Sequence, residues 1–425
     1  MASVLARRTA VLPKLQARFS SSSGAALRKT PLYDFHVAQG AKMAPFAGFH
    51  MPIQYGSVGL VESHKFTRSH ASLFDVSHMV QHIFQGPAAA PFLEKVTPAG
   101  VSSLPLFQSR LSTLLWPETG GIVDDTIITR IGEDKFHVVT NAGCRDKDLA
   151  YFDQQMASSG VSVTKDTWRV EDNGGLVALQ GPKAARILQA VLATDVDLKT
   201  VLFGSVVFAQ LRLPGGAASR TVQIARGGYT GEDGFEISMF IPAGEAGDAS
   251  AEMTAIVEAL MAAGGEDLKL AGLGARDSLR LEAGMCLYGH DLNDSITPVE
   301  ASLAWVIPPE RRTTGGFHGA DVILAQLKPK SKGGKGVEKR RVGFVVEGPA
   351  PAREGAVIRS KEGEEIGVVT SGSPSPSLGK NIAMGYIKDG MHKTGTEVDV
   401  VIRNKPRPAK VAKMPFVPTQ YWKGA

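Results

Sequence analysis

The residues of this 425-residue sequence that are best placed to do chemistry begin with two adjacent carboxylates, Asp124 and Asp125. They follow Gly120 and Gly121 and open a run of β-branched residues, which predicts a tight turn that enters a strand. Side chains alternate along a strand, so the two carboxylates are expected on opposite faces. One can then be structural while the other faces a site. Two solvated turn aspartates are the competing interpretation.

A second candidate is the glycine-rich segment 226–237, in which the backbone can approach a ligand closely. Tyr229 offers a flat aromatic face, and Glu236 offers a carboxylate that enters the next strand. An ordinary hairpin with a glycine-rich turn is the alternative. The segment lacks the Gly-Lys-Ser/Thr ending of a phosphate loop, and the chain contains no G-x-G-x-x-G. No nicotinamide or flavin cofactor is therefore predicted.

Arg276 and Arg280 form the third candidate, because a spacing of four places both on one face of a helix. A solvated arginine pair is the alternative. His78 and His82 also have a spacing of four. Their surroundings read as a strand, however, and no third ligand is identifiable, so no metal is predicted.

Helices and strands must position these candidates. Residues 249–263 and 271–283 carry Ala, Leu, Ile and Met at helical spacing. Residues 86–93 recur weakly as 181–188, each after an apolar strand-like segment and each with a proline where a helix can start. The recurrence favours an α+β architecture of two related halves, although two similar helix starts could also arise by chance.

The sequence changes character near its C-terminal end. A Gly/Lys/Pro stretch at 328–336 without apolar periodicity predicts a solvated linker. Short apolar segments at 341–346, 365–370 and 397–402 follow it, separated by turns, which indicates an antiparallel barrel or sandwich. The predicted organisation is a region of two interleaved α+β domains at 30–327, a linker at 328–337 and a barrel at 338–425.

Composition and charge restrict the classes of protein further. The chain is 43% apolar and 21% charged, as globular proteins are. Residues 1–29 contain six basic residues, no acidic residue and a serine run, which predicts a transit peptide, and the sequence around Arg18 favours a mitochondrial one. The two cysteines, Cys144 and Cys286, cannot form a disulfide framework or a paired zinc motif.

The remaining charge is nearly balanced, with 41 basic residues against 42 acidic ones, so nucleic acid is not a predicted partner. It is unevenly distributed: residues 30–327 carry a net charge of −11 and residues 328–425 a net charge of +10. Such an asymmetry can steer an acidic partner or hold the two parts together. No apolar run approaches the roughly 18 residues that cross a membrane, so membrane insertion is not predicted.

Motifs continue in a fixed order along almost all of residues 30–422. They include Leu-Phe-Asp-Val-Ser-His-Met, Gly-Gly-Ile-Val-Asp-Asp, Gly-Tyr-Thr-Gly-Glu-Asp-Gly and Lys-Met-Pro-Phe-Val-Pro-Thr, at 73–79, 120–125, 228–234 and 413–419. Further motifs lie at 30–33, 141–144, 178–182, 270–284, 369–372, 375–378 and 384–386. In this order they resemble the mitochondrial aminomethyltransferases of the glycine cleavage system.

The resemblance implies a fold and a reaction. The fold would be a multidomain α+β, folate-binding aminomethyltransferase fold closed by a C-terminal antiparallel β-barrel. The enzyme would transfer the methylene of an aminomethyl group on the lipoyl arm of the carrier (H) protein to tetrahydrofolate. The products would be 5,10-methylenetetrahydrofolate, ammonia and the dihydrolipoyl carrier. Looser partners would be the glycine decarboxylase and dihydrolipoyl dehydrogenase components, all in the mitochondrial matrix.

The resemblance also implies roles for individual residues. Asp125 matches the functional aspartate, which would orient the folate nitrogen and stabilise a cationic iminium-like centre. Glu236 matches the residue that reads the pterin edge, since two carboxylate oxygens fit two adjacent N–H donors. The other matching pocket residues are Arg276, Tyr386, Tyr229, Asn141 and Met79. The sequence departs from the family pattern at His137, where tyrosine is frequent, and at Ser112, where a larger side chain is frequent.

Two other classes share this fold. The folate domain of a dimethylglycine or sarcosine dehydrogenase would need an attached flavin domain, for which we expect no room. A folate-binding iron–sulfur cluster assembly factor would carry Lys-Gly-Cys-Tyr-x-Gly-Gln where this chain has Arg-Gly-Gly-Tyr-Thr-Gly-Glu at 226–232, without the cysteine. A glycine-dependent assay with added carrier separates them, because an assembly factor would release no ammonia.

Overall fold

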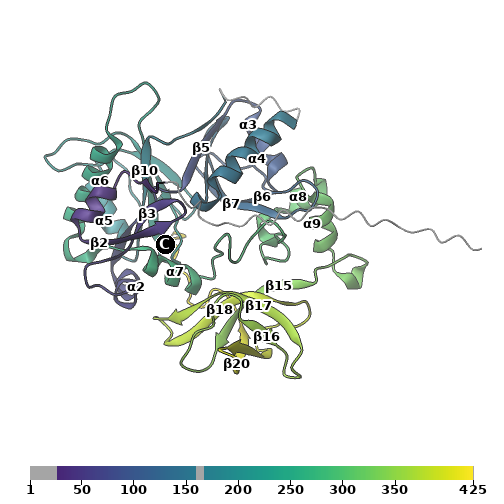
Figure 1. Ribbon diagram of the computed structural model, residues 1–425. Coiled ribbons are helices and arrows are strands. Elements are labelled where there is room, and N and C mark those ends of the chain that lie inside the picture. The colour runs from purple at the N-terminus through teal and green to yellow at the C-terminus, as the bar shows by residue number, and fades with distance from the viewer. Residues whose placement is uncertain (1–25, 159–166, 425) are drawn as a thin grey trace, which may run out of the picture.

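The computed structural model describes residues 26–158 and 167–424. Residues 1–25 of the predicted leader lie outside this part of the chain, whereas Arg28 and Lys29 form the short strand β1. The described residues form three β-sheets and a closed β-barrel, with helices packed around the sheets (Figure 1). None of their helices is long and apolar enough to cross a membrane.

A six-stranded sheet organises one α+β unit, and it is antiparallel except for the edge pair β4 and β14. Its strands in spatial order are β11 (Val206–Ala209), β12 (Val222–Arg226), β13 (Gly234–Phe240), β10 (Gly174–Gln180), β4 (Ala71–Asp75) and β14 (Leu268–Leu270). Helices α5 (Ala184–Val191) and α6 (Ala249–Gly264) pack together against it. Phe235, Ile237 and Met239 of β13 belong to the same buried core, so the alternate residues of that strand point the other way.

A five-stranded antiparallel sheet organises the second α+β unit. Its strands in spatial order are β6 (Ser109–Leu115), β7 (Ile122–Gly132), β8 (Lys135–Thr140), β5 (Val80–Gln85) and β9 (Trp168–Val170). Helices α3 (Ala89–Val96) and α4 (Arg145–Ser158) cover one face of it (Figure 1). Phe84, Phe92 and Phe152 join the sheet and these helices in one aromatic core.

The chain passes from one unit to the other and back. It contributes β4 to the six-stranded sheet, builds the five-stranded sheet from β5 to β9, and returns to the first sheet at β10. The recurring sequence segments correspond to β5 followed by α3 and to β10 followed by α5. The predicted strand-turn-helix recurrence is therefore present, once in each unit.

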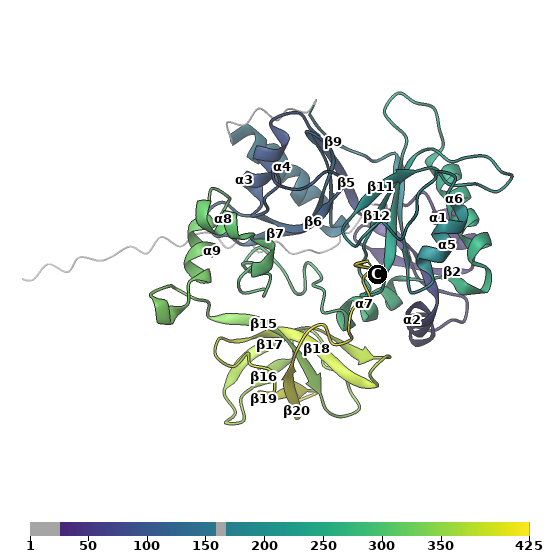
Figure 2. The same cartoon turned by 180° about the vertical axis from the view of Figure 1, so that it is seen from behind.

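The C-terminal domain is a closed six-stranded antiparallel barrel, as the sequence predicted. Its strands in spatial order are β15 (Lys339–Val346), β18 (Lys380–Lys388), β17 (Glu365–Ser375), β16 (Val357–Arg359), β19 (Glu397–Ile402) and β20 (Lys405–Ala412). Helix α7 (Leu273–Glu282) lies between the sheets and the barrel, where it contacts β17 and β18 (Figures 1 and 2).

Smaller elements fill the edges. β3 (Phe49–Tyr55) lies between β1 and β2 (Ala41–Phe46) in a three-stranded sheet, and α7 contacts β3 and α2 (Leu60–Ser69). The remaining helices are α1 (Tyr33–Ala38), α8 (Pro309–Thr314) and α9 (Ala320–Leu327). The predicted linker contains a 3₁₀ turn at Lys330–Lys332. The expected α+β architecture with a C-terminal antiparallel barrel is confirmed.

Candidate active site

A turn that requires glycine holds the aspartate pair. Gly120 has a φ of +67°, which favours glycine, and a Cβ on Gly121 would lie 1.9 Å from the backbone oxygen of Asp294. β7 begins immediately after this turn, so both aspartates lie in an ordered strand. Asp124 is fully buried, whereas Asp125 stays partly exposed. The two carboxylates have different surroundings, as strand alternation predicts.

Asn141 connects the two carboxylates. The antiparallel register that pairs Ile127 with Val139 brings Asn141 beside Asp125, at the start of a 3₁₀ turn over Ala142–Cys144. Its amide nitrogen Nδ2 donates to Oδ1 of Asp124 at 2.9 Å and to Oδ1 of Asp125 at 2.8 Å. An amide has two N–H donors, so one goes to each carboxylate.

The β12–β13 hairpin and helix α7 bring an aromatic ring and a guanidinium together at the candidate site. Tyr229 lies in the hairpin between β12 and β13, and its hydroxyl donates to the backbone oxygen of Cys286. The Cζ atom of Arg276, on α7, lies 4.8 Å from the centre of the Tyr229 ring. Nη1 of Arg276 is buried and has no hydrogen-bond partner within the described residues. A buried guanidinium donor without a partner marks a position where a ligand oxygen or nitrogen fits.

Glu236 points to the face of β13 opposite its core residues, because side chains alternate along the strand. Burial raises the pKa of its carboxyl, and the positive charge of Arg276 opposes that shift. Glu236 and Arg276 therefore lie close enough to act on each other's charge, although they come from a strand and a helix about forty positions apart in the sequence.

Met79 and Tyr386 lie at the margins of this group. Met79, between β4 and β5, packs against the apolar cluster that includes Ala275 and Leu279 on α7. Tyr386, on barrel strand β18, is 5% exposed, and its hydroxyl donates to the backbone oxygen of Asp291 at 2.7 Å. Tyr386 thus lies at the interface between the barrel and the rest of the protein, and its hydroxyl is already engaged in a hydrogen bond.

The electrostatics single out Asp125. Burial first, and the charge of Asp124 second, raise the pKa of Asp125 to about 7. Its charge in turn raises the pKa of the Tyr229 hydroxyl, for which burial is the larger cause, so the two side chains lie near each other. Six of the seven predicted residues remain partly exposed, namely Met79, Asp125, Asn141, Tyr229, Glu236 and Arg276. Solvent therefore still reaches these side chains.

His78 belongs to this region, although its spacing to His82 suggested only a metal pair. Its Nδ1 is buried without a hydrogen-bond partner among the described residues. Burial lowers its pKa to about 4, and Arg276 contributes to the lowering. The ring is therefore neutral. The sequence could have pointed to His78, because it directly precedes the predicted pocket residue Met79.

Arg280 is not the solvated arginine that its spacing allowed. It is 3% exposed and donates to Asp277, to Asp291 at 2.7 Å and to Ser371 of barrel strand β17 at 3.0 Å. Arg276 faces the candidate site, whereas Arg280 joins α7 to the barrel.

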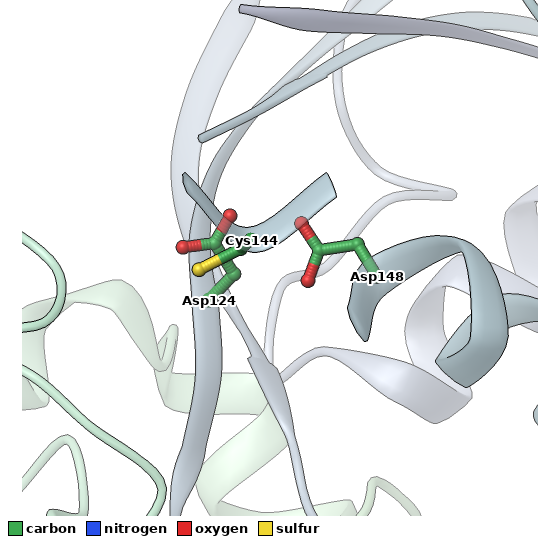
Figure 3. Close-up of side chains that lie close together, drawn as sticks. All are labelled: Asp124, Cys144 and Asp148. Carbon is green, nitrogen blue, oxygen red and sulfur yellow. The ribbon is translucent and has the colours of Figure 1, made fainter. Parts of the chain in front are cut away.

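Another group of chemical side chains lies behind the strand that carries Asp125. Asp124, Cys144 and Asp148 are all buried, and their ligand-type atoms lie within 4.8 Å of one another. Figure 3 shows Asp148 directed from α4 toward the other two. Among the described residues this is the group whose spacing could surround an ion, and it contains neither His78 nor His82.

Comparison with known proteins identifies the class that this fold and site define. A model of the GCVT N-terminal domain matches residues 32–311, and a model of the glycine cleavage T-protein C-terminal barrel domain matches residues 339–418. The two matches correspond to the interleaved α+β units and to the barrel. The resemblance noted from the motifs is confirmed.

Similar proteins cover nearly the whole chain. A probable mitochondrial aminomethyltransferase of Schizosaccharomyces pombe is 44% identical, over 98% of this chain and 100% of that protein. The mitochondrial aminomethyltransferase of Mesembryanthemum crystallinum is 45% identical, over 99% and 97%. The crystal structure of aminomethyltransferase T from Bartonella henselae is similar with a TM-score of 0.81 at 37% identity, over 93% and 99%. The chain belongs to the glycine cleavage T-protein family and is an aminomethyltransferase of the glycine cleavage system.

Proposed function

We propose that the chain transfers the methylene of the aminomethyl group on a lipoylated carrier (H) protein to tetrahydrofolate. The products are 5,10-methylenetetrahydrofolate, ammonia and the dihydrolipoyl carrier. Tetrahydrofolate, when bound, supplies the nitrogen atoms that take up the methylene. The observation that carries the proposal is the partly exposed Asp125, held by the hydrogen bond from Asn141, together with the buried and unpaired Nη1 donor of Arg276.

Glu236, Arg276 and Tyr229 suit a folate ligand. Glu236 can accept two hydrogen bonds from adjacent N–H groups of the pterin, and such donors would favour its ionised form. The free Nη1 of Arg276 can donate to an acceptor on the same ligand. Tyr229 supplies a flat face, and Met79 and Tyr386 close the apolar margin.

Asp125 is the proposed catalytic residue. A group with a pKa near the working pH is present in both protonation states, which suits a residue that holds or moves a proton. Its Oδ1 is aimed by the 2.8 Å hydrogen bond from Asn141. Ionised Asp125 would hydrogen-bond a ligand N–H and stabilise positive charge that develops in front of it.

The carrier is the proposed macromolecular partner, with the glycine decarboxylase and dihydrolipoyl dehydrogenase components as looser ones. The net positive C-terminal part suits an acidic carrier surface, and its sequence offers Lys335, Arg340 and Arg341 as candidates for the attraction. Arg341 is buried at 5% exposure and donates within the protein, and Arg340 is paired with Asp389. The exposed lysines of the linker are better placed for this role, with Lys335 among them.

We also propose a mitochondrial matrix location, with a leader within residues 1–29. The similar proteins of Schizosaccharomyces pombe and Mesembryanthemum crystallinum are both named as mitochondrial. The proposed organisation is the folate-binding catalytic region at 30–327, the linker at 328–337 and the barrel at 338–425. Helix α9 ends at Leu327 and strand β15 begins at Lys339, which supports the proposed limits of the linker.

Ammonia release from aminomethylated carrier, with and without tetrahydrofolate, tests the proposal. Asp125→Asn is expected to lower turnover by at least about 10²-fold while folate affinity changes by only a few-fold. Asp134→Asn, an exposed aspartate in the turn between β7 and β8, is the matched control and should keep wild-type turnover. Near-normal turnover of Asp125→Asn would exclude this residue as the catalytic group.

A further inference from the structure

The buried group behind Asp125 has more carboxylates than its surroundings can keep ionised. Asp148 has an exposed fraction of 0%, and by geometry neither of its oxygens accepts a hydrogen bond from a donor among the described residues. Asp124 is equally buried and lies next to it (Figure 3). Two like charges at this separation in a buried site cannot both persist, so one carboxyl retains a proton.

The hydrogen bonds decide which carboxyl is protonated. Asp124 accepts from the backbone N of Asn141 at 2.8 Å, from Nδ2 of Asn141 at 2.9 Å and from the thiol of Cys144. A carboxylate has about four lone-pair positions, so one remains for a donor from Asp148. Asp148, by contrast, has no partner by geometry among the described residues, and the Thr140 side chain lowers its pKa less than burial and Asp124 raise it. The missing hydrogen bond is explained if Asp148 is itself the donor to Asp124.

We propose that Asp124 and Asp148 share one proton held on Asp148, and that the ionised Asp124 is a positioning residue that aims Asn141 at Asp125. Asp148 then acts as a neutral acid at physiological pH. Burial first, and then the charge of Asp124, raise its pKa well above the usual range of an aspartate. The function of Asp124 depends on the proposed role of Asp125, whereas the shared proton does not.

The other titratable groups around Asp124 and Asp148 do not remove the need for this shared proton. Cys144 faces Asp124 from the 3₁₀ turn, and burial with the two carboxylates raises the pKa of its thiol, so it remains a donor. Lys147 lowers the pKa of Asp148 only as a lesser cause, because its ammonium is bonded to Tyr288 and Asp294. Tyr151 and Tyr288 also lie near the pair; burial raises the pKa of both hydroxyls, and each donates to a backbone oxygen.

The pair is expected to set the proton affinity of the catalytic residue. The negative charge of Asp124 is the second cause, after burial, of the raised pKa of Asp125. The other titratable groups that face Asp125 are Tyr229 and Cys286, and both stay neutral because burial raises their pKa values. Removing the charge of Asp124 should therefore make Asp125 a weaker base.

Two variants separate this arrangement from a purely structural one. Asn is isosteric with a neutral Asp148, so Asp148→Asn should leave turnover within about two-fold and the acid limb of the kcat/KM profile in place. Asp124→Asn should move that limb to lower pH by about one unit or more, because a like charge is removed. An equal movement of the limb in Asp148→Asn would show that Asp148 is ionised and would overturn the proposal.

A measurement that needs no activity completes the test. At pH 7 the infrared spectrum of Asp125→Asn, which lacks the partly protonated carboxyl of Asp125, should contain the C=O band of a protonated carboxyl, and adding Asp148→Asn to that variant should remove the band. Persistence of the band in the double variant would contradict the assignment of the proton to Asp148. A stoichiometric metal in the purified protein, lost in Asp148→Asn, would show an ion in place of the proton. Failure of Asp125 as a catalytic residue would leave the infrared result unchanged.

Discussion

The guanidinium of Arg276 lies 4.8 Å above the ring of Tyr229, and this contact joins helix α7 to the β12–β13 hairpin at the candidate site. The Tyr229 hydroxyl already donates to the backbone oxygen of Cys286. The ring can therefore act as a platform while its hydroxyl is occupied. Arg276 retains a buried Nη1 donor, so it can hold a ligand and the ring at the same time.

Replacing the planar cation should weaken folate binding more than turnover. A lysine at position 276 cannot reproduce the stacked plane and its several donors, so Arg276→Lys should raise KM for tetrahydrofolate about tenfold. Lys269, 4.6 Å from the ring of Phe66, makes the same type of contact on an exposed face, and Lys269→Gln serves as the control. Steady-state kinetics at saturating carrier measure the change. An unaltered KM would remove Arg276 from the binding residues.

Asp125 should limit stability at the pH at which it is proposed to act. Its folded-state pKa of about 7 is higher than the usual value near 3.8, so folding stability falls as pH rises between these two values. Asp125→Asn removes this effect and should raise the free energy of unfolding at pH 8 by about 1 kcal/mol or more. At pH 4 the difference should nearly vanish. Thermal unfolding at both pH values measures it, and a variant less stable than wild type at pH 8 would be the opposite outcome.

The glycine turn before the aspartates should tolerate no side chain. A Cβ on Gly121 would meet the Asp294 carbonyl oxygen at 1.9 Å, and backbone cannot rotate out of the way. Gly121→Ala is expected to lower the free energy of unfolding by about 3 kcal/mol. Gly59 has an ordinary φ and open space at its Cβ position, so Gly59→Ala is the control. Chemical denaturation distinguishes the two, and equal stability of both variants would contradict the tight approach.

The sequence predicted those features that depend on neighbours in the chain. The spacing at 249–263 and 271–283 corresponds to α6 and α7, and the alternation at Asp124 and Asp125 correctly separated a buried carboxylate from a partly exposed one. The barrel strands followed from short apolar segments and turns. These patterns record the period of a single element and the side of it that is buried.

Contacts between distant segments were not predictable in this way. Asp148 reaches Asp124 only because α4 packs on the sheet that contains β7, and nothing in the local pattern of either segment requires it. The buried position of Arg280 likewise depends on Asp291 and the barrel. The spacing of four predicted that Arg276 and Arg280 share one face of α7. The hairpin and barrel residues that they contact, however, come from distant parts of the chain and could not be predicted from that spacing.

Carrier binding should depend on salt through the exposed lysines of the linker. Lys328, Lys332 and Lys335 are exposed, and reversal of their charges should reduce the salt dependence of the apparent carrier affinity. Lys42, Lys65 and Lys199 are exposed lysines of the other units, and reversing these is the matched control. Carrier KM measured across a series of salt concentrations tests the effect. An unchanged slope in the linker variant would place the carrier elsewhere.

Among the described residues, the carboxylate that accepts the most hydrogen bonds should couple acid stability to the attachment of the barrel. Glu282, at the end of α7, is fully buried and accepts from His64 at 3.0 Å, Arg68 at 2.8 Å and two barrel serines, Ser375 and Ser377. Burial opposes its ionisation, but the hydrogen bonds from His64 and Ser375 outweigh burial and lower the pKa to about 2. The stability that it contributes is therefore present above its unfolded pKa near 4.5 and is lost as pH falls toward 2.

Glu282→Ala should lower the free energy of unfolding at pH 7 by about 3 kcal/mol or more, because it leaves His64 buried without its carboxylate partner and removes one of the two carboxylates that pair with Arg68. The loss should shrink as the pH falls toward 2, where wild-type Glu282 also becomes protonated. Glu397 forms an exposed pair with Lys410 on the barrel, so Glu397→Ala is the control, with an expected effect of about 1 kcal/mol or less. Calorimetry across pH resolves the two. If Glu282→Ala and Glu397→Ala lost the same stability at every pH, Glu282 would not be the residue that attaches the barrel.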